Sequence, residues 1–155
     1  MRSACNAVLM RVIRTSILIA APPWKVWAVL IALHEYSQWN PLNVSAEGEA
    51  RTGAKVLMTF VDAGGGKGKL ITQTVIVTKC EHERLLEWVG RIPLLFTGRH
   101  RFELWREGEG TRLLHGEDLS GLLPSLFSRS RLSRQAAAYD QMNAALASRV
   151  CQLSS

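Results

Sequence analysis

The stretch RSRLSRQAAAYDQMNAALASRVCQL, residues 129–153, decides the fold of this chain. Its apolar residues recur at steps of three, four or their sum, which places them on one face of a helix. No Gly or Pro interrupts the stretch, and the polar residues Ser130, Arg134, Asp140, Gln141 and Arg149 lie off the apolar face. The apolar face consists of Leu132, Ala136, Tyr139, Leu146, Val150 and Leu153. Such a helix is about 30 Å long. It needs a broad apolar surface to cover.

The chain upstream predicts the strands that supply this surface. A β-branched first strand at 11–21 ends at two prolines, and a helix from Pro23 to about His34 and a shorter helical turn at 35–38 follow. From Leu42 onward the hydrophobic period becomes two. The clearest strand stretches there are 55–60, 70–79, 85–92, 97–106 and 111–119. This order predicts an α+β domain in which an antiparallel sheet wraps a long C-terminal helix, with a cavity between them.

Length and composition fit one domain. The 155 residues are 47% hydrophobic, which is enough for a sizeable core. We expect a single domain at 11–155 and an N-terminal extension at 1–10 that is free to move. No apolar run reaches the ~20 residues of a membrane span. Residues 1–10 also lack the pattern of a secretory signal, so we expect a cytoplasmic protein.

Charge and cysteine content exclude several functions. The net charge of +6 is spread over short Arg-containing segments with no run of five basic residues, so nucleic acid is not an expected partner. Contact with a membrane surface stays open. Cys5, Cys80 and Cys151 are odd in number and far apart, which indicates reduced thiols. The sequence contains no metal-binding spacing and no dinucleotide fingerprint, so we expect neither metal nor cofactor.

Three polar residues occupy positions that should face inward. By the period of two, His100 shares a face with Phe102, and His115 and Glu117 share a face with Leu113. A hairpin turn at 107–110 with a loop of two or four residues places His100 opposite Glu117. We expect the two side chains within hydrogen-bond reach. They could then act as an acid/base pair or simply brace the sheet.

The other candidate residues form the expected wall of the cavity. On the closing helix, Asn143 lies on the apolar face, where its amide needs partners, and the Tyr139 hydroxyl can point into the cavity or into the core. The segment 122–127 is an apolar loop that could serve as a lid or anchor the helix start. The full expected lining is Trp39, Val56, Met58, Phe60, Leu86, Trp88, Phe102, Leu104, Leu113, Leu119, Tyr139, Asn143 and Leu146.

Several short motifs make the chain resemble a known superfamily. They are Ala20-Ala21-Pro22-Pro23 with Trp27 and Leu30, Tyr36-Ser37-Gln38-Trp39-Asn40-Pro41, Glu87-Trp88, Thr111-Arg112 with His115-Gly116-Glu117, Ser120-Gly121-Leu122-Leu123, and Met142-Asn143 with Leu146. This set resembles the START/Bet v 1-like (SRPBCC) superfamily, in particular its bacterial polyketide cyclase/dehydrase-like branch, over nearly the whole chain. The resemblance implies a helix-grip fold with seven antiparallel strands around an apolar cavity.

Three functions remain open at this point. The resemblance favours binding of a hydrophobic small molecule, such as a lipid, an isoprenoid or a polyketide-like compound. The second is a cyclase or dehydratase that uses His100, His115 and Glu117 as acid/base groups on a polyketide-like substrate. The third is a protein-interaction module. The superfamily shares no set of catalytic residues, and its fold alone does not decide between binding and catalysis. Neither the ligand nor the oligomeric state follows from the sequence.

Overall fold

The computed structural model describes residues 9–153 and contains one sheet, two main helices and several short helical segments. The predicted extension at 1–10 lies outside this range apart from Leu9 and Met10, which belong to no element. The elements in chain order are β1 (Arg11–Ile19), α1 (Pro23–Ile31), η1 (Leu33–Glu35), α2 (Tyr36–Trp39), β2 (Asn43–Glu47), β3 (Lys55–Val61), η2 (Ala63–Gly65), β4 (Leu70–Glu81), β5 (Leu85–Ile92), β6 (Phe96–Glu107), β7 (Gly110–Ser120), α3 (Leu122–Ser125) and α4 (Arg129–Gln152).

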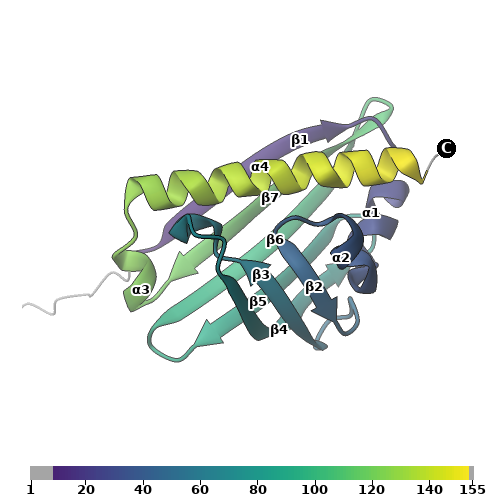
Figure 1. Cartoon of the computed structure of the whole chain (residues 1–155). Helices are drawn as coiled ribbons and strands as arrows, with labels where there is room; N and C mark the ends of the chain where they lie inside the picture. The colour runs from purple at the N-terminus through teal and green to yellow at the C-terminus, as the bar shows by residue number, and fades with distance from the viewer. Residues whose placement is uncertain (1–8, 154–155) are drawn as a thin grey trace, which may run out of the picture.

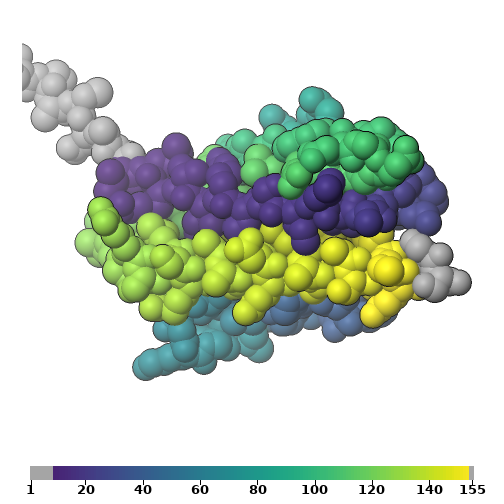
Figure 2. Space-filling view, turned by 90° about the horizontal axis from the view of Figure 1, so that it is seen from above, coloured from purple at the N-terminus to yellow at the C-terminus, as the bar shows by residue number. Residues whose placement is uncertain are grey.

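The sheet has seven antiparallel strands, as expected, and their order is β1-β7-β6-β5-β4-β3-β2. The strands from β2 to β7 form a meander, and β1 joins it beside β7. The sheet therefore curls without closing, and α4 lies across its concave face (Figure 1). Viewed from above, α4 runs the length of the domain with β1 along one side (Figure 2). The chain thus has the helix-grip fold.

Local sequence explains the segments between β1 and β2. Pro23 occupies the start of α1, where the missing N–H costs nothing. The helix ends at Ile31 because Ala32 leaves the helical conformation, so it is three residues shorter than predicted. After α2, the Asn40 side chain accepts hydrogen bonds from the backbone N–H groups of Leu42 and Asn43, at 2.9 and 2.8 Å. This turn directs the chain into β2.

The closing helix packs as the periodicity predicted through most of its length. Ser128 caps its start, and its buried residues are Tyr139, Met142, Asn143, Leu146 and Val150. Leu153 is exposed because the helix has ended at Gln152. The segment 122–127, predicted to be a loop, contains the short helix α3, which begins after Gly121 with a φ of +110°.

Candidate functional site

A cavity of about 380 Å³ lies between the sheet and the N-terminal half of α4. This volume is within the roughly 300–1,000 Å³ of small-molecule sites. Most of its wall is apolar, and its apolar side chains include Met58, Phe60, Trp88, Phe96, Leu119 and Phe127. These side chains give the cavity the character of a site for an apolar molecule.

Two glycines keep the floor of the cavity open. Gly90 of β5 and Gly98 of β6 lie directly opposite each other, and both line the cavity. A Cβ atom on Gly98 would lie 2.6 Å from Oε1 of Glu117 and 2.9 Å from Cζ of Phe96. A Cβ atom on Gly90 would lie 2.9 Å from Oε1 of Gln73. Larger residues here would fill the space that a ligand could occupy.

A carboxyl and a phenol form one part of the polar end of the cavity. Tyr139 of α4 donates a hydrogen bond to Oε2 of Glu117, and Gln135 Nε2 donates to the Tyr139 hydroxyl at 3.3 Å. Burial raises the pKa of Glu117 to about 7 against the opposing effect of the Tyr139 hydrogen bond. Burial, followed by the neighbouring Glu117 charge, raises the pKa of Tyr139 well above its usual value. Glu117 can therefore hold or release a proton near neutral pH.

A chain of hydrogen bonds leads from β1 to the cavity. Asn143 Nδ2 donates to Thr15 Oγ1 at 2.9 Å, and Asn143 Oδ1 is 2.8 Å from His115 Nδ1. His115 Nε2 is 2.8 Å from Nε2 of His100. His115 lies behind the cavity wall, while His100 lines the cavity. The series of hydrogen bonds therefore ends at His100, on the wall of the cavity.

Both imidazoles are neutral at physiological pH. Burial lowers the pKa of His115 to about 4. Burial, and then the proximity of His115, lowers the pKa of His100 well below its usual value.

Aromatic rings hold both imidazole side chains in place. His100 is stacked on Trp88 with centroids 4.9 Å apart, and His115 is stacked on Tyr139 at 4.4 Å.

The predicted hairpin register is confirmed, but the predicted side-chain contact is wrong. His100 pairs with Glu117 across β6 and β7, because the loop is the two residues Gly108 and Glu109. Nevertheless, their side chains hydrogen-bond to other partners, His115 and Tyr139. The reason is that α4 brings Tyr139 to the carboxyl, whereas His115 is two residues away from Glu117 on the same face of β7 and reaches the imidazole.

The structure divides the predicted cavity residues into two groups. Five residues line the cavity: Met58, Phe60, Trp88, Leu119 and Tyr139. Eight do not, and they are Trp39, Val56, Leu86, Phe102, Leu104, Leu113, Asn143 and Leu146. Most of these eight belong to the packed core beneath the C-terminal half of α4, which α1 and α2 also cover. Strand periodicity shows which face is inward but not where the packed core ends.

Several cavity residues were not predicted as site residues. Gly98, Phe96, Gln135 and Arg131 all line the cavity. A signal existed for Gly98, which lies two residues before His100 on the inward face of β6, where a missing side chain leaves a gap. Arg131 and Gln135 gave no signal, because a polar residue near the start of an amphipathic helix usually faces solvent.

The mouth of the cavity is at the end of the domain where α4 begins. There Arg131 pairs with Asp62 at 2.7 Å and lies over the Phe127 ring at 4.3 Å. Arg134 donates to the Gly64 carbonyl at 2.7 Å. These contacts fasten the loop around η2 to α4 beside the mouth.

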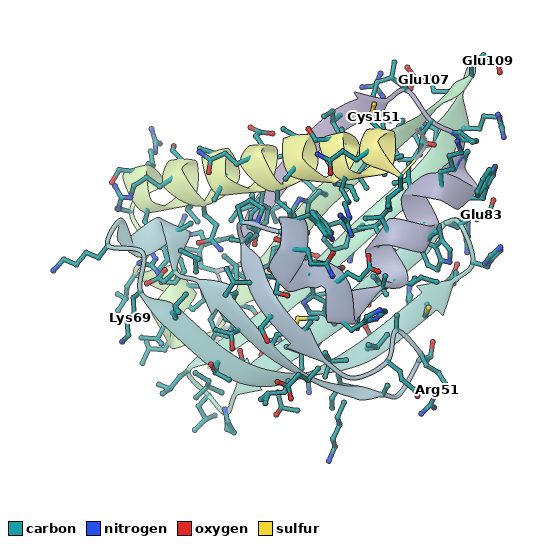
Figure 3. The ribbon with its side chains drawn as sticks, turned by 45° about the vertical axis from the view of Figure 1, so that its right-hand side comes forward. Arg51, Lys69, Glu83, Glu107, Glu109 and Cys151 are labelled. Atoms are coloured by element: carbon teal, nitrogen blue, oxygen red, sulfur yellow. The ribbon has the colours of Figure 1, made fainter. Side chains whose placement is uncertain are left out.

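Exposed leucines lie beside the mouth. The backbone N–H groups of Leu122 and Leu123 donate to the carbonyls of Leu94 and Leu95, so α3 and the β5–β6 turn lie side by side (Figure 1). Leu94 is 94% exposed, and Leu126 is 75% exposed. Lys69 extends from the same end, whereas Glu83, Glu107 and Glu109 lie at the opposite end (Figure 3). The mouth is therefore apolar with positive charge nearby.

The described residues give no sign of a metal site or a membrane span. Within residues 9–153, no group of three or more His, Cys, Asp or Glu side chains is placed to hold a metal ion. None of the helices in that range is both long and apolar enough to cross a bilayer.

Comparison with known proteins gives a family match and many similar folds. The family described as polyketide cyclase/dehydrase and lipid transport matches residues 10–150. Similar solved structures include a START superfamily protein from Mycobacterium smegmatis, with 17% identity, a TM-score of 0.76 and coverage of 92% of this chain and 98% of that chain. A protein from Thermus thermophilus has 19% identity and a TM-score of 0.76, covering 94% and 100%.

An aromatase/cyclase from Streptomyces sp. R1128 is also similar. It has 18% identity and a TM-score of 0.68, and the match covers 92% of this chain and 94% of that one. The comparison with curated proteins gave no match. At these identities the structural likeness concerns the fold.

Proposed function

The chain belongs to the polyketide cyclase/dehydrase and lipid-transport family, and we propose that it binds a hydrophobic small molecule in the cavity between its sheet and α4. The observation that carries this proposal is the cavity of about 380 Å³, with a mostly apolar wall that also contains His100 and Glu117. Packed cores contain few voids larger than a water molecule. A hollow of this size, kept open by Gly90 and Gly98, supports binding of a lipid, an isoprenoid or a polyketide-like compound.

The exposed leucines beside the mouth support a route for an apolar ligand. A ligand that leaves Phe127 and Leu123 at the cavity wall next meets Leu126, Leu122 and Leu94 on the surface. Delivery from a lipid bilayer would keep such a ligand out of water along this path. Lys67, Lys69 and Arg91 are exposed near the same end and would favour an anionic membrane surface.

The test is displacement of a fluorescent apolar probe. N-phenyl-1-naphthylamine should bind the native protein with enhanced fluorescence, and fatty acids or polyketide-like aromatics should compete with it. Gly90→Leu should abolish this binding, because its side chain enters the cavity and only the flexible end of Gln73 must move. Thr97→Leu is the matched control, since Thr97 lies on the outer face of β6. Equal probe binding by both variants would contradict the proposal.

A second candidate function is dehydration or cyclisation of a polyketide-like substrate. The observation in its favour is that a neutral imidazole and a carboxyl with a pKa of about 7 line the same cavity from adjacent strands. In a dehydration, His100 would take the proton from the substrate carbon. Glu117 would give its proton to the leaving hydroxyl, and water and a carbon–carbon double bond would result.

Turnover by variants separates catalysis from binding alone. If Glu117 acts as the acid, Glu117→Gln should abolish turnover of a polyketide-like β-hydroxy ketone while its dissociation constant changes little. If the protein only binds its ligand, wild type will show no turnover. His115 does not touch the cavity, so its role in either case would be to hold His100.

A further inference from the structure

The hydrogen-bond chain behind the cavity wall has a direction. The Thr15 hydroxyl donates to the His115 carbonyl at 3.1 Å, so its oxygen accepts from Nδ2 of Asn143 at 2.9 Å. The Asn143 carbonyl oxygen therefore faces His115 Nδ1 at 2.8 Å and requires a proton there. A neutral His115 then carries a lone pair on Nε2.

The direction continues to the cavity. His115 Nε2 and His100 Nε2 are 2.8 Å apart, and one proton must lie between them. Because His115 Nε2 is an acceptor, the proton belongs to His100 Nε2. A neutral His100 then has no proton on Nδ1. None of the residues 9–153 is hydrogen-bonded to this nitrogen, and the His100 ring lines the cavity.

We propose that Thr15, Asn143 and His115 fix His100 in the tautomer that presents a bare Nδ1 lone pair to the cavity, and that the ligand carries a hydroxyl group that donates to it. This inference rests on the proposed binding function and specifies the ligand chemistry as an apolar body with an O–H donor at its inner end. Thr15 and Asn143 act as positioning residues, since neither touches the ligand.

Burial is what fixes the direction of these hydrogen bonds. Asn143 and His115 are buried, so the nitrogens and oxygens of the hydrogen-bond chain are satisfied by protein groups, which for His115 include the backbone of Tyr139. Trp88 stacks on the His100 ring with an angle of 3° between the planes, which fixes the edge that carries Nδ1. An unpaired acceptor at the end of an apolar cavity discriminates strongly between ligands that can donate to it and ligands that cannot.

The first test is the tautomer itself, measured without any ligand. Two-bond proton–nitrogen correlation spectra of the ¹⁵N-labelled full chain at neutral pH distinguish protonated from bare imidazole nitrogens. The expected result is a proton on Nδ1 of His115 and on Nε2 of His100. A proton on Nδ1 of His100 would mean that Asn143 is reversed, and this would overturn the inference.

Two substitutions of Thr15 test the source of the direction. Thr15→Val keeps the shape of the side chain but removes its hydroxyl. The hydrogen bonds from Asn143 to His100 can then run in either direction, so His100 should populate both tautomers. Thr15→Ser restores the hydroxyl and should restore the wild-type spectrum. An unchanged tautomer in a folded Thr15→Val protein would overturn the role assigned to Thr15.

The second test is a pair of ligands that differ in one donor. Fluorescence titration should show 2-naphthol binding about tenfold more tightly than 2-methoxynaphthalene, which has the same rings but no O–H. This ratio should fall to near one in His100→Phe. Equal affinity of the two probes for wild type would overturn the inference while leaving the cavity proposal intact. Failure of both to bind would count against the cavity proposal, and the spectrum would still decide the tautomer.

Discussion

The raised pKa of Glu117 predicts an unusual dependence of stability on pH, and Glu117→Gln tests it. In the folded protein the carboxyl titrates at about 7, compared with a reference value of 4.5. Between these values the folded state keeps a proton that the unfolded chain has released. Stability contributed by this group is therefore lost as pH rises from about 4.5 to 7. A shift of this size corresponds to about 3 kcal/mol.

Because His100 and His115 also make stability depend on pH, the contribution of Glu117 has to be measured as a difference between two proteins. Burial lowers the pKa of His115 to about 4 and also lowers the pKa of His100. In this pH range the unfolded chain therefore binds protons that the folded state does not. Their contribution to stability is lost as pH falls through the range between about 6.5 and 4, opposite in direction to that of Glu117. The free energy of unfolding of wild type minus that of Glu117→Gln cancels the histidine terms.

The assay is urea denaturation of both proteins at intervals from pH 4.5 to 7.5. The free energy of unfolding of wild type minus that of Glu117→Gln should fall by about 3 kcal/mol over this range. Wild type therefore loses stability relative to the variant as the pH rises. Glu109→Gln is the control, because Glu109 lies at the exposed hairpin tip (Figure 3) and its change should leave the curve unaltered. A difference that stays within about 0.5 kcal/mol would refute the inference that Glu117 lies in a desolvated site.

Two further predictions concern the core and the mouth. Leu146→Ala should lower the free energy of unfolding by about 2–5 kcal/mol in chemical denaturation, because Leu146 is buried on the inner face of α4. A loss below about 0.5 kcal/mol would place Leu146 outside the core. Replacing both Leu94 and Leu126 by Asp should abolish co-sedimentation with phosphatidylglycerol vesicles. Leu57→Asp, on the outer face of β3, should leave it unchanged, and equal sedimentation of both variants would contradict a membrane contact at the mouth.

Most of the fold could be predicted because its determinants are local or periodic. The period of α4 gave its buried face, and the short Gly-containing loop between β6 and β7 fixed the register that places His100 opposite Glu117. The end of α1 was less certain, since only the backbone of Ala32 stops it and alanine carries no stop signal.

The partners of the polar groups could not be predicted, because they come from elements far apart in the sequence. His115 meets Asn143, 28 residues later, and Asn143 meets Thr15, 128 residues earlier. The sequence showed that Asn143 needed a partner but not which one. The same reason explains the misplaced contact of Glu117: strand pairing sets which residues are opposite, whereas α4 decides which side chains meet.

The boundary between filled core and open cavity follows from where the small and large residues lie. At the end covered by α1 and α2, Phe102, Leu104 and Leu113 fill the inner face of the sheet. Toward α3 the inward positions of β5 and β6 become Gly90 and Gly98, and the space that they leave lies open beneath the N-terminal half of α4. Trp88, His100 and Tyr139 lie at the transition, where one side of each ring packs and another side faces the cavity. Polar atoms at such a boundary can be satisfied from the packed side, and this leaves Nδ1 of His100 and Oε1 of Glu117 without a hydrogen-bond partner among residues 9–153.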